Sequence, residues 1–294
     1  MRYRIKHTTR YQYSSPVSMC FNEARMSPLN TMHQTCARNR FVIHPVPDSL
    51  DKRFDYYGNQ VTSFDILQPH KELSVTVHSE VQVLDHSQQS LFTGDTPWEQ
   101  VRDRMQESTN PEHIILREYI LPSPLIPIID EVREYAAASF TSGRPIMEAV
   151  RDLMSRIYTE FKYDPASTTI STPLKAVMEH RRGVCQDFAH LGIACIRSVG
   201  LPAAYVSGYL ETLPPPGEKK LEGADASHAW FSVYMLEDGW LQFDPTNNQM
   251  PSDQYITLAF GRDFADVTPL KGVIYGGDEH ELGVFVDVVR IEES

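Results

Sequence analysis

Apolar and polar residues alternate through the first part of the chain. The alternation is clearest in YRIKHTTRYQY, RFVIH and LSVTVHSEVQV, which are rich in β-branched and aromatic residues. Turn-forming residues separate these runs at Asn30, at Pro45 to Asp48 and at Tyr57-Gly58-Asn59. Because successive side chains of a strand point to opposite faces, this period of two predicts strands. We therefore expect an all-β domain from Met1 to about Asp85.

The period then lengthens to that of helices. TPWEQVRDRMQ, PLIPIIDEVREYAAASF and PIMEAVRDLMSRIYTEF carry apolar residues three and four positions apart, and each predicts a helix. STPLKAVMEHRRG predicts another, with Thr172 as its N-cap and Pro173 at its first helical position. CQDFAHLGIACIRSVG predicts a further helix that begins near Cys185 and stops at Gly200.

Strand-like alternation returns after these helices. It occurs in AAYVSGYL, HAWFSVYM and GWLQFD, and later in ITLAF and LGVFVDVVRI. Helices followed by a run of strands predict the α+β class rather than a doubly wound fold. We expect an all-β N-terminal domain over residues 1–88 and a second part over residues 89–294 that contains the helices and the later strands. The boundary is expected in the polar residues 85–89.

The charge balance excludes some functions. Lys and Arg number 27 against 39 Asp and Glu, which gives a formal net charge of −12. Nucleic-acid binding needs a basic surface, so we expect no nucleic-acid partner. No run approaches the roughly 18 apolar residues of a membrane helix, so no membrane partner is expected. The start, MRYRIKHTTRYQYSS, lacks the apolar core of a secretory signal, so a cytoplasmic location is expected.

Four cysteines occur, and no CxxC pair is among them. We expect free thiols, as is usual in a reducing compartment. Cys185 lies at the predicted start of a helix, where unpaired N–H groups and the helix dipole lower the pKa of a thiol. This position suits a nucleophile, although a structural role for Cys185 stays open. Cys195 faces the apolar stripe of the same helix and is expected to be structural, like Cys20 and Cys36.

A cysteine nucleophile needs a base and a group that orients the base. His228 begins a predicted strand and Asp244 ends the next one. A three-residue loop at Glu237-Asp238-Gly239 would pair Ser232 with Asp244. His228 and Asp244 would then share a face but lie roughly 13 Å apart along the strands. Contact between them therefore requires a longer connection or a bulge.

Several motifs in order carry a family resemblance. GVCQDFAHL, GLPAAYVSGYL, ASHAWFSVYM and GWLQFDPTNN resemble the core of the transglutaminase-like cysteine hydrolase superfamily. HTTRYQYSSPV and ARMSP resemble the β-rich N-terminal region of its bacterial members. The resemblance implies a papain-like α+β core with helices packed on an antiparallel sheet. It also implies Cys185 as nucleophile, His228 as general base and acid, and Asp244 as the residue that orients the imidazole.

The resemblance also bears on how the oxyanion is held. The backbone N–H of Cys185 is the natural first donor to an oxyanion. Relatives use an upstream aromatic side chain as the second donor, for which Tyr163 is the candidate and Gln186 a weaker one. Many relatives carry Arg where this chain has Ala204, which leaves specificity open.

The leading hypothesis is a cysteine-dependent hydrolase of peptide or amide bonds that works through a thioester. A transamidating protein cross-linker or a peptide-N-glycanase-type amidase would use the same three residues. An alternative of another class is a catalytically silent module that binds a peptide or a partner. We expect a peptide, protein or amide substrate and no cofactor, since GxxxxGK[ST], GxGxxG and HExxH are absent from the sequence. No metal site is expected, because His180, Cys185 and His190 would scatter around a helix axis.

Overall fold

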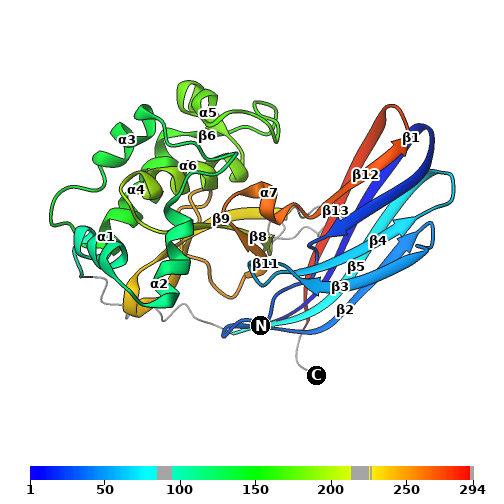
Figure 1. Cartoon of the computed structure of the whole chain (residues 1–294), viewed down its shortest axis with the longest axis horizontal. Helices are drawn as coiled ribbons and strands as arrows, with labels where there is room; N and C mark the ends of the chain where they lie inside the picture. The colour runs from blue at the N-terminus through cyan, green and yellow to red at the C-terminus, as the bar shows by residue number, and fades with distance from the viewer. Residues whose placement is uncertain (85–94, 213–224, 226, 292–294) are drawn as a thin grey trace, which may run out of the picture.

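A helical core and a sheet of long strands lie side by side in the molecule (Figure 1). The computed structural model describes residues 1–84, 95–212, 225 and 227–291. The predicted boundary at residues 85–89 lies outside these described residues. The division into residues 1–88 and 89–294 therefore stays a prediction.

The N-terminal part consists of strands, as its alternation predicts. They are β1 (Arg2–Ala24), β2 (Gln34–His44), β3 (Ser49–Phe54), β4 (Gln60–Ile66) and β5 (His70–Val83). The predicted turn at residues 57–59 connects β3 to β4, and Gly58 takes a positive φ of 81° there. The first half of β1 pairs with β5 and its second half pairs with β4. Tyr13 and Val17 of β1 point into an apolar core shared with β4 and β5, and after a bulge between Val17 and Met19 the inward side passes to Cys20 and Ala24.

Helices and shorter strands make up the rest of the chain. The helical elements are α1 (Trp98–Glu107), α2 (Pro111–Leu116), η2 (Arg117–Ile120), α3 (Asp130–Ala137), α4 (Ile146–Glu160), α5 (Leu174–His180), α6 (Cys185–Ser198), η3 (Leu236–Asp238) and α7 (Phe264–Val267). The strands are β6 (Lys162–Tyr163), β7 (Arg182–Gly183), β8 (Ala203–Leu210), β9 (Ser227–Tyr234), β10 (Trp240–Phe243), β11 (Tyr255–Gly261), β12 (Leu270–Gly276) and β13 (His280–Ile291).

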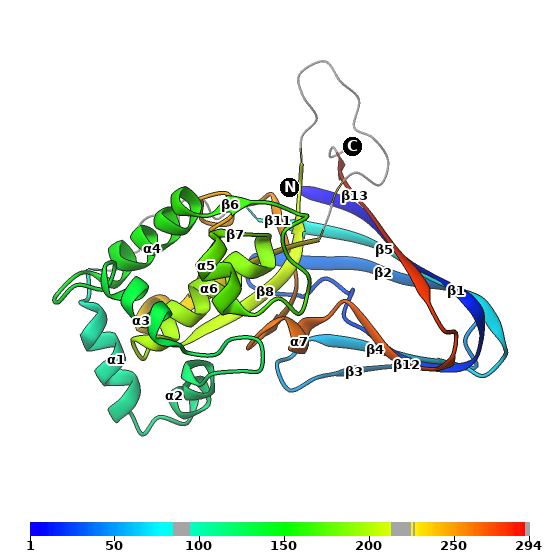
Figure 2. The ribbon, with the colours of Figure 1, turned by 90° about the horizontal axis from the view of Figure 1, so that it is seen from above.

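The core sheet is antiparallel and carries α6 on one face. Its strand order is β10-β9-β8-β11. Odd-numbered residues of β9, such as Phe231, pack with Leu191 and its neighbours from α6 in one large apolar core. Helices α3, α4 and α5 cover the outer side of α6 (Figure 2). The predicted α+β class, with helices on an antiparallel sheet, is confirmed.

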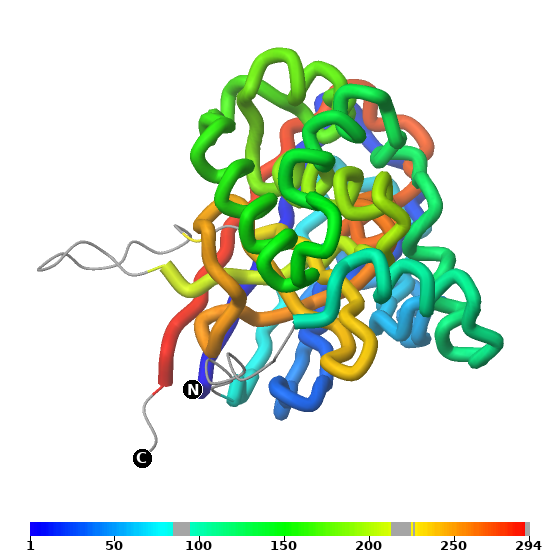
Figure 3. The backbone as a smooth tube through the Cα atoms, turned by 90° about the vertical axis from the view of Figure 1, so that its left-hand side faces the viewer, coloured from blue at the N-terminus to red at the C-terminus, as the bar shows by residue number. Residues whose placement is uncertain are grey.

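The last two strands return to the N-terminal sheet. β12 pairs with the second half of β1, where Val273 lies opposite Phe21, and β13 pairs with the first half, where Val288 lies opposite Ile5. Figure 3 shows the final strand, in red, beside the first one, in blue. Alternation identifies a strand but not its partner, so the sequence alone did not predict this pairing.

The predicted helix before α6 differs at its ends. α5 begins at Leu174, with Pro173 as the N-cap. The hydroxyl of Thr172, the expected cap, accepts a hydrogen bond from the N–H of Thr169 instead. Arg181 ends the helix in a left-handed conformation and leads into β7. Two further helical elements, α2 and η2, were not expected from the sequence.

Across residues 1–84, 95–212, 225 and 227–291, no helix has both the length and the apolar character that crossing a bilayer requires.

Candidate active site

Cys185 is the first residue of α6, as the sequence predicts. The carboxylate of Asp187 folds back over this helix end and accepts hydrogen bonds from the N–H of Val184 at 2.8 Å and from the hydroxyl of Thr168 at 2.7 Å. Gly183 makes room for it, because a Cβ there would lie 2.7 Å from the Cβ of Asp187. The N–H of a first helical residue has no acceptor within its own helix. The half-buried thiol of Cys185 therefore sits beside backbone N–H groups that favour negative charge.

The strand register brings His228 and Asp244 closer than the sequence suggests. Phe243 pairs with Phe231, and Gln242 rather than Asp244 lies opposite Ser232, so the expected pairing was wrong by two positions. The connection runs from Met235 to Gly239 through the short helix η3, and the Met235 N–H bonds to the Gly239 carbonyl. This loop is longer than three residues. Contact between His228 and Asp244 required either a longer connection or a bulge, and the structure contains the longer connection.

The side chains of Cys185, His228 and Asp244 come together in the structure. Nε2 of His228 lies 2.7 Å from Oδ2 of Asp244. Cys185 lies close enough to His228 for its negative charge to raise the pKa of the imidazole, and Nδ1 is the ring nitrogen that Asp244 leaves free. Asp244 is fully buried, whereas the side chain of His228 keeps 11% exposure. The imidazole thus lies between a half-buried thiol and a buried carboxylate.

His228 and Asp244 each shift the pKa of the other. Burial lowers the pKa of His228, but its hydrogen bond to Asp244 and the negative charges of Asp244 and Cys185 outweigh burial and raise the pKa to about 10. Burial raises the pKa of Asp244, but the hydrogen bond and positive charge of His228 lower it below its ordinary value overall. The geometry therefore favours an imidazolium ion at His228 beside a carboxylate ion at Asp244.

His228 is one of several hydrogen-bond donors to the carboxylate of Asp244. Oδ1 accepts the backbone N–H groups of Thr246 and Asn247, at 2.8 and 3.3 Å. Oδ2 accepts the side-chain amide of Asn247 and the hydroxyl of Tyr255, each at 2.7 Å, beside His228. Sequence reasoning missed both residues. Asn247 lies inside the motif GWLQFDPTNN, which could have pointed to it, but Tyr255 lies on another strand and gave no signal.

The two candidate oxyanion donors differ in their surroundings. Tyr163, on β6, is half exposed, with its ring centroid 6.4 Å from that of Phe188 on α6. Burial, and secondly the negative charge of Cys185, raise the pKa of Tyr163, so its hydroxyl lies within electrostatic reach of the thiolate. The amide of Gln186 donates to the carbonyl oxygen of Ile170 at 3.3 Å. Among the described residues the hydroxyl of Tyr163 has no hydrogen-bond partner, whereas the amide of Gln186 is already engaged.

The other cysteines lie outside this cluster. All four are free thiols. Cys195 and Cys20 are fully buried, and burial raises the pKa of each. Burial also raises the pKa of the half-buried Cys36, whose thiol faces the carbonyl of Arg38.

The histidine of α6 that follows Cys185 has a structural contact. His190 is buried and accepts the N–H of Phe264 at 3.2 Å. In the part of the chain that the structure describes, no group of three or more His, Cys, Asp or Glu side chains is placed to hold a metal ion.

Ala204 is buried on β8, directly opposite Ser232 of β9. The hydroxyl of Ser232 is buried as well and has no hydrogen-bond partner among the described residues. The position where many relatives carry Arg is thus an apolar one here, beside an unsatisfied hydroxyl.

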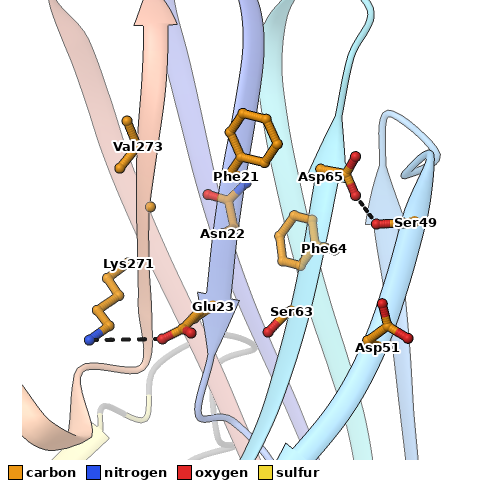
Figure 4. A pocket seen from close by; sticks show the side chains of 11 residues that line it. Phe21, Asn22, Glu23, Ser49, Asp51, Ser63, Phe64, Asp65, Lys271 and Val273 are labelled. Carbon is orange, nitrogen blue, oxygen red and sulfur yellow. Dashed lines mark hydrogen bonds and ion pairs between the residues drawn. The ribbon is translucent and has the colours of Figure 1, made fainter.

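A hollow of about 650 Å³ lies on the N-terminal sheet, away from Cys185. Strands β1, β3, β4 and β12 line it, with Phe21 and Val273 in its apolar part (Figure 4). Glu23 forms an ion pair with Lys271 at its lower end, and Ser49 donates a hydrogen bond to Asp65 at its side. A second hollow of about 610 Å³ lies between residues 31–34 and strands β10 and β11. Neither includes Cys185 or His228.

Two family models match this chain. Residues 3–82 match the bacterial transglutaminase-like N-terminal region. Residues 133–245, which include Cys185, His228 and Asp244, match the transglutaminase-like superfamily.

Individual relatives agree with these matches. An uncharacterized protein of Mycobacterium tuberculosis is 43% identical over 298 residues, covering 99% of this chain and 93% of that protein. A protein-glutamine gamma-glutamyltransferase of Pseudomonas aeruginosa is 29% identical over 138 residues, or 42% of this chain and 20% of its own length. The crystal structure of a "putative cysteine protease" from Cytophaga hutchinsonii superimposes with a TM-score of 0.77 at 22% identity, covering 100% of this chain and 92% of that one. This last similarity shows a shared fold.

Proposed function

The chain belongs to the transglutaminase-like superfamily, and from that membership we propose that it is a cysteine-dependent hydrolase of peptide or amide bonds. One observation carries the proposal. His228 is hydrogen-bonded to the buried carboxylate of Asp244 and lies within electrostatic range of Cys185, at the start of α6. A thiol, an imidazole and a carboxylate in this order form the arrangement that activates a cysteine nucleophile.

In the acylation half of the reaction, the Cys185 thiolate attacks the carbonyl carbon of an amide. The carbonyl oxygen takes the negative charge of the tetrahedral intermediate. The C–N bond then breaks, and the imidazolium of His228 gives its proton to the leaving amine. A thioester on Cys185 and a neutral imidazole remain. The Asp244 carboxylate keeps the ring of His228 oriented throughout.

In the deacylation half, water attacks the thioester carbonyl while His228 takes one of its protons. The C–S bond breaks, the acid product leaves, and the thiolate–imidazolium pair forms again. The oxyanion of both steps needs donors. The N–H of Cys185 at the start of α6 is one, and the hydroxyl of Tyr163 is the proposed second.

The test is the rate at which iodoacetamide alkylates Cys185 as a function of pH, with the modified peptide located by mass spectrometry. An ordinary thiol has a pKa of about 8.5. We expect Cys185 to react rapidly well below that pH in the native protein, and His228→Ala to remove this advantage. Cys36, which is half-buried and whose thiol faces the carbonyl of Arg38, is the control in the same sample. Equal, ordinary pH profiles for Cys185 and Cys36 would end the hydrolase proposal.

Transfer of the acyl group to an amine instead of water is the second candidate. The name of the Pseudomonas aeruginosa relative, protein-glutamine gamma-glutamyltransferase, favours it. A glutamine-containing peptide would release ammonia in both reactions. Incorporation of a labelled primary amine into the peptide would identify transfer. Conversion of the glutamine to glutamate without incorporation would identify hydrolysis.

A partner-binding role without catalysis remains the contrasting hypothesis. A p-nitrophenyl acetate assay separates it from both reactions, because acylation of the thiol releases nitrophenolate. We expect Cys185→Ala to abolish this release. If the folded Cys185→Ala protein releases nitrophenolate at the native rate, Cys185 is not the nucleophile and the binding role gains support.

A further inference from the structure

We propose that Tyr255 is a positioning residue that holds Oδ2 of Asp244 toward His228 and limits how strongly this carboxylate attracts the imidazole proton. The inference rests on the proposed function and adds a residue to it. Three donors converge on Oδ2, namely Nε2 of His228, the amide of Asn247 and the hydroxyl of Tyr255, each at 2.7 Å.

The ring of Tyr255 fixes where its hydroxyl lies. Tyr255 begins β11, pairs with Leu210 of β8 and is 4% exposed. Its ring stands edge-on to that of Trp230, with centroids 5.2 Å apart at 82°. Trp230 in turn donates its indole N–H to Gln242 at 2.7 Å. An aromatic ring in such packing has little freedom, so the hydroxyl stays at the carboxylate.

The direction of the hydrogen bond follows from a neighbour. The amide nitrogen of Gln249 donates to the Tyr255 oxygen at 2.6 Å, which leaves the tyrosine proton for Asp244. The backbone of Gln249 pairs with that of Asp244 in both directions, so the donor is held in register. Tyr255 therefore acts as a donor to the carboxylate.

Titratable groups reach His228 from three sides. They are Cys185 of α6, Asp244 after β10 and, through Asp244, Tyr255 of β11. Burial and the charge of Asp244 raise the pKa of Tyr255 above its ordinary value, so the hydroxyl keeps its proton while His228 titrates.

Donors that share one oxygen also share its negative charge. Without the tyrosine proton, Oδ2 carries more charge toward the imidazolium, and the imidazolium becomes harder to deprotonate. Asn247 bonds to the same oxygen from the exposed side, where water can replace its amide. Tyr255 lies on the buried side, so nothing takes the place of its hydroxyl when that group is removed. We therefore expect a larger effect from Tyr255→Phe than from Asn247→Ala.

The experiment measures alkylation of Cys185 by iodoacetate against pH. The imidazolium attracts this anionic reagent, so the rate falls as His228 loses its proton. We expect Tyr255→Phe to move this alkaline fall upward by about half a pH unit to one unit, a three- to tenfold change in the proton equilibrium. Tyr209→Phe is the matched control. It removes another buried hydroxyl on the neighbouring strand, one that contacts His7 instead of Asp244, and should leave the fall where it is.

A double variant separates positioning from a general structural role. In an Asp244→Asn background the charged oxygen is gone, so adding Tyr255→Phe should not move the fall further. An equal shift in both backgrounds, or no shift in Tyr255→Phe, would overturn the inference. If Tyr255→Phe does not fold, Gln249→Ala tests it at an exposed residue, with a smaller upward shift expected and no shift contradicting it. A native protein in which Cys185 reacts like an ordinary thiol would instead contradict the proposed function.

Discussion

The hydroxyl of Tyr209 lies 2.7 Å from Nδ1 of His7, across the junction between the N-terminal sheet and the core. Both residues are buried, and Thr9 contacts the other ring nitrogen of His7 at 3.2 Å. Tyr209 belongs to β8, which pairs with the strand that carries His228. The first strand of the chain is thus tied to the sheet that positions the candidate base.

This contact predicts that acid destabilises the fold. Burial lowers the pKa of His7 to about 4, so the folded protein keeps it neutral where the unfolded chain, with a pKa near 6.5, becomes protonated. The contribution of neutral His7 to the free energy of unfolding is complete above pH 6.5 and is lost as pH falls toward 4. It amounts to roughly 3 kcal/mol in the free energy of unfolding. Urea unfolding of native protein and His7→Asn at pH 7 and pH 4.5 measures it.

The variant should lose less stability than the native protein between these two pH values. His78→Asn is the control, because His78 is exposed on β5 and water solvates both forms of its ring. If His7→Asn loses as much stability on acidification as the native protein, the burial of His7 does not contribute to acid sensitivity.

A second prediction concerns the charge of Asp244. Asp244→Asn removes the negative charge and hydrogen bond that raise the pKa of His228 to about 10, and burial, which lowers this pKa, then prevails. The alkaline fall in Cys185 alkylation should move down by several pH units, toward pH 6.5 or below. Acylation by p-nitrophenyl acetate at pH 7.5 should slow on the order of 10²- to 10⁴-fold.

Asp253→Asn makes the same charge change outside the cluster. It should change neither the pH of the alkaline fall nor the rate of acylation.

The ion pair between His228 and Asp244 also changes the free energy of unfolding in a defined direction. Because the folded pKa of His228 is raised, its contribution is full below pH 6.5 and declines as pH rises toward about 10. Asp244→Asn should therefore destabilise the protein more at pH 6 than at pH 10. The reverse order would contradict an imidazolium at His228.

A third prediction concerns the second oxyanion donor. Tyr163→Phe keeps the ring next to Phe188 but removes the hydroxyl. If this hydroxyl stabilises the oxyanion, acylation by p-nitrophenyl acetate should slow about tenfold to a hundredfold. Alkylation of Cys185 by iodoacetamide forms no oxyanion and should be unchanged. Tyr158→Phe, at a tyrosine of α4 with the same 50% exposure, is the control. Equal slowing of both reactions would indicate a disturbed thiol instead.

Local signals in the sequence were sufficient for much of the fold. Cys185 could be placed at a helix start because the flanking glycine and the apolar spacing of α6 are both local. Alternation likewise revealed β1, β8 and β9. Each of these features depends on residues within one element, where propensity and periodicity act directly.

Features that depend on distant residues could not be predicted. The contact between His228 and Asp244 depends on η3, whose extra residues change the register by two positions. Tyr255 reaches Asp244 only because β11 crosses to the far side of β8. The return of β12 and β13 to β1 is set by pairing that no single run of residues encodes.

A fourth prediction follows from the unsatisfied hydroxyl of Ser232. A buried polar group without a partner costs about 1–3 kcal/mol. Ser232→Ala removes that group opposite Ala204 and leaves only a small void. We expect the free energy of unfolding to stay the same or rise by about 1 kcal/mol, measured by urea denaturation. Ser207→Ala, at a buried serine of β8 that is not among the unsatisfied groups, is the control. A loss above 1 kcal/mol in Ser232→Ala alone would mean that a bound water satisfies the hydroxyl.

The last prediction tests whether strand spacing keeps the cluster in register. Gly208 pairs with His228 on one side and with Thr257 of β11 on the other. A Cβ at this position would overlap the carbonyl oxygen of Ile256 and lie 2.5 Å from the ring of Trp230. Backbone cannot yield as a flexible side chain does, so Gly208→Ala should push β8 and β11 apart and destabilise the fold by about 3 kcal/mol or more. Gly283→Ala, where the new Cβ meets only the side chain of Phe285 at 3.0 Å, should be tolerated. Gly208→Ala should then lower the temperature of thermal unfolding and also remove the rapid alkylation of Cys185. Normal alkylation in that variant would show that the register of β8 does not control the reactive cysteine.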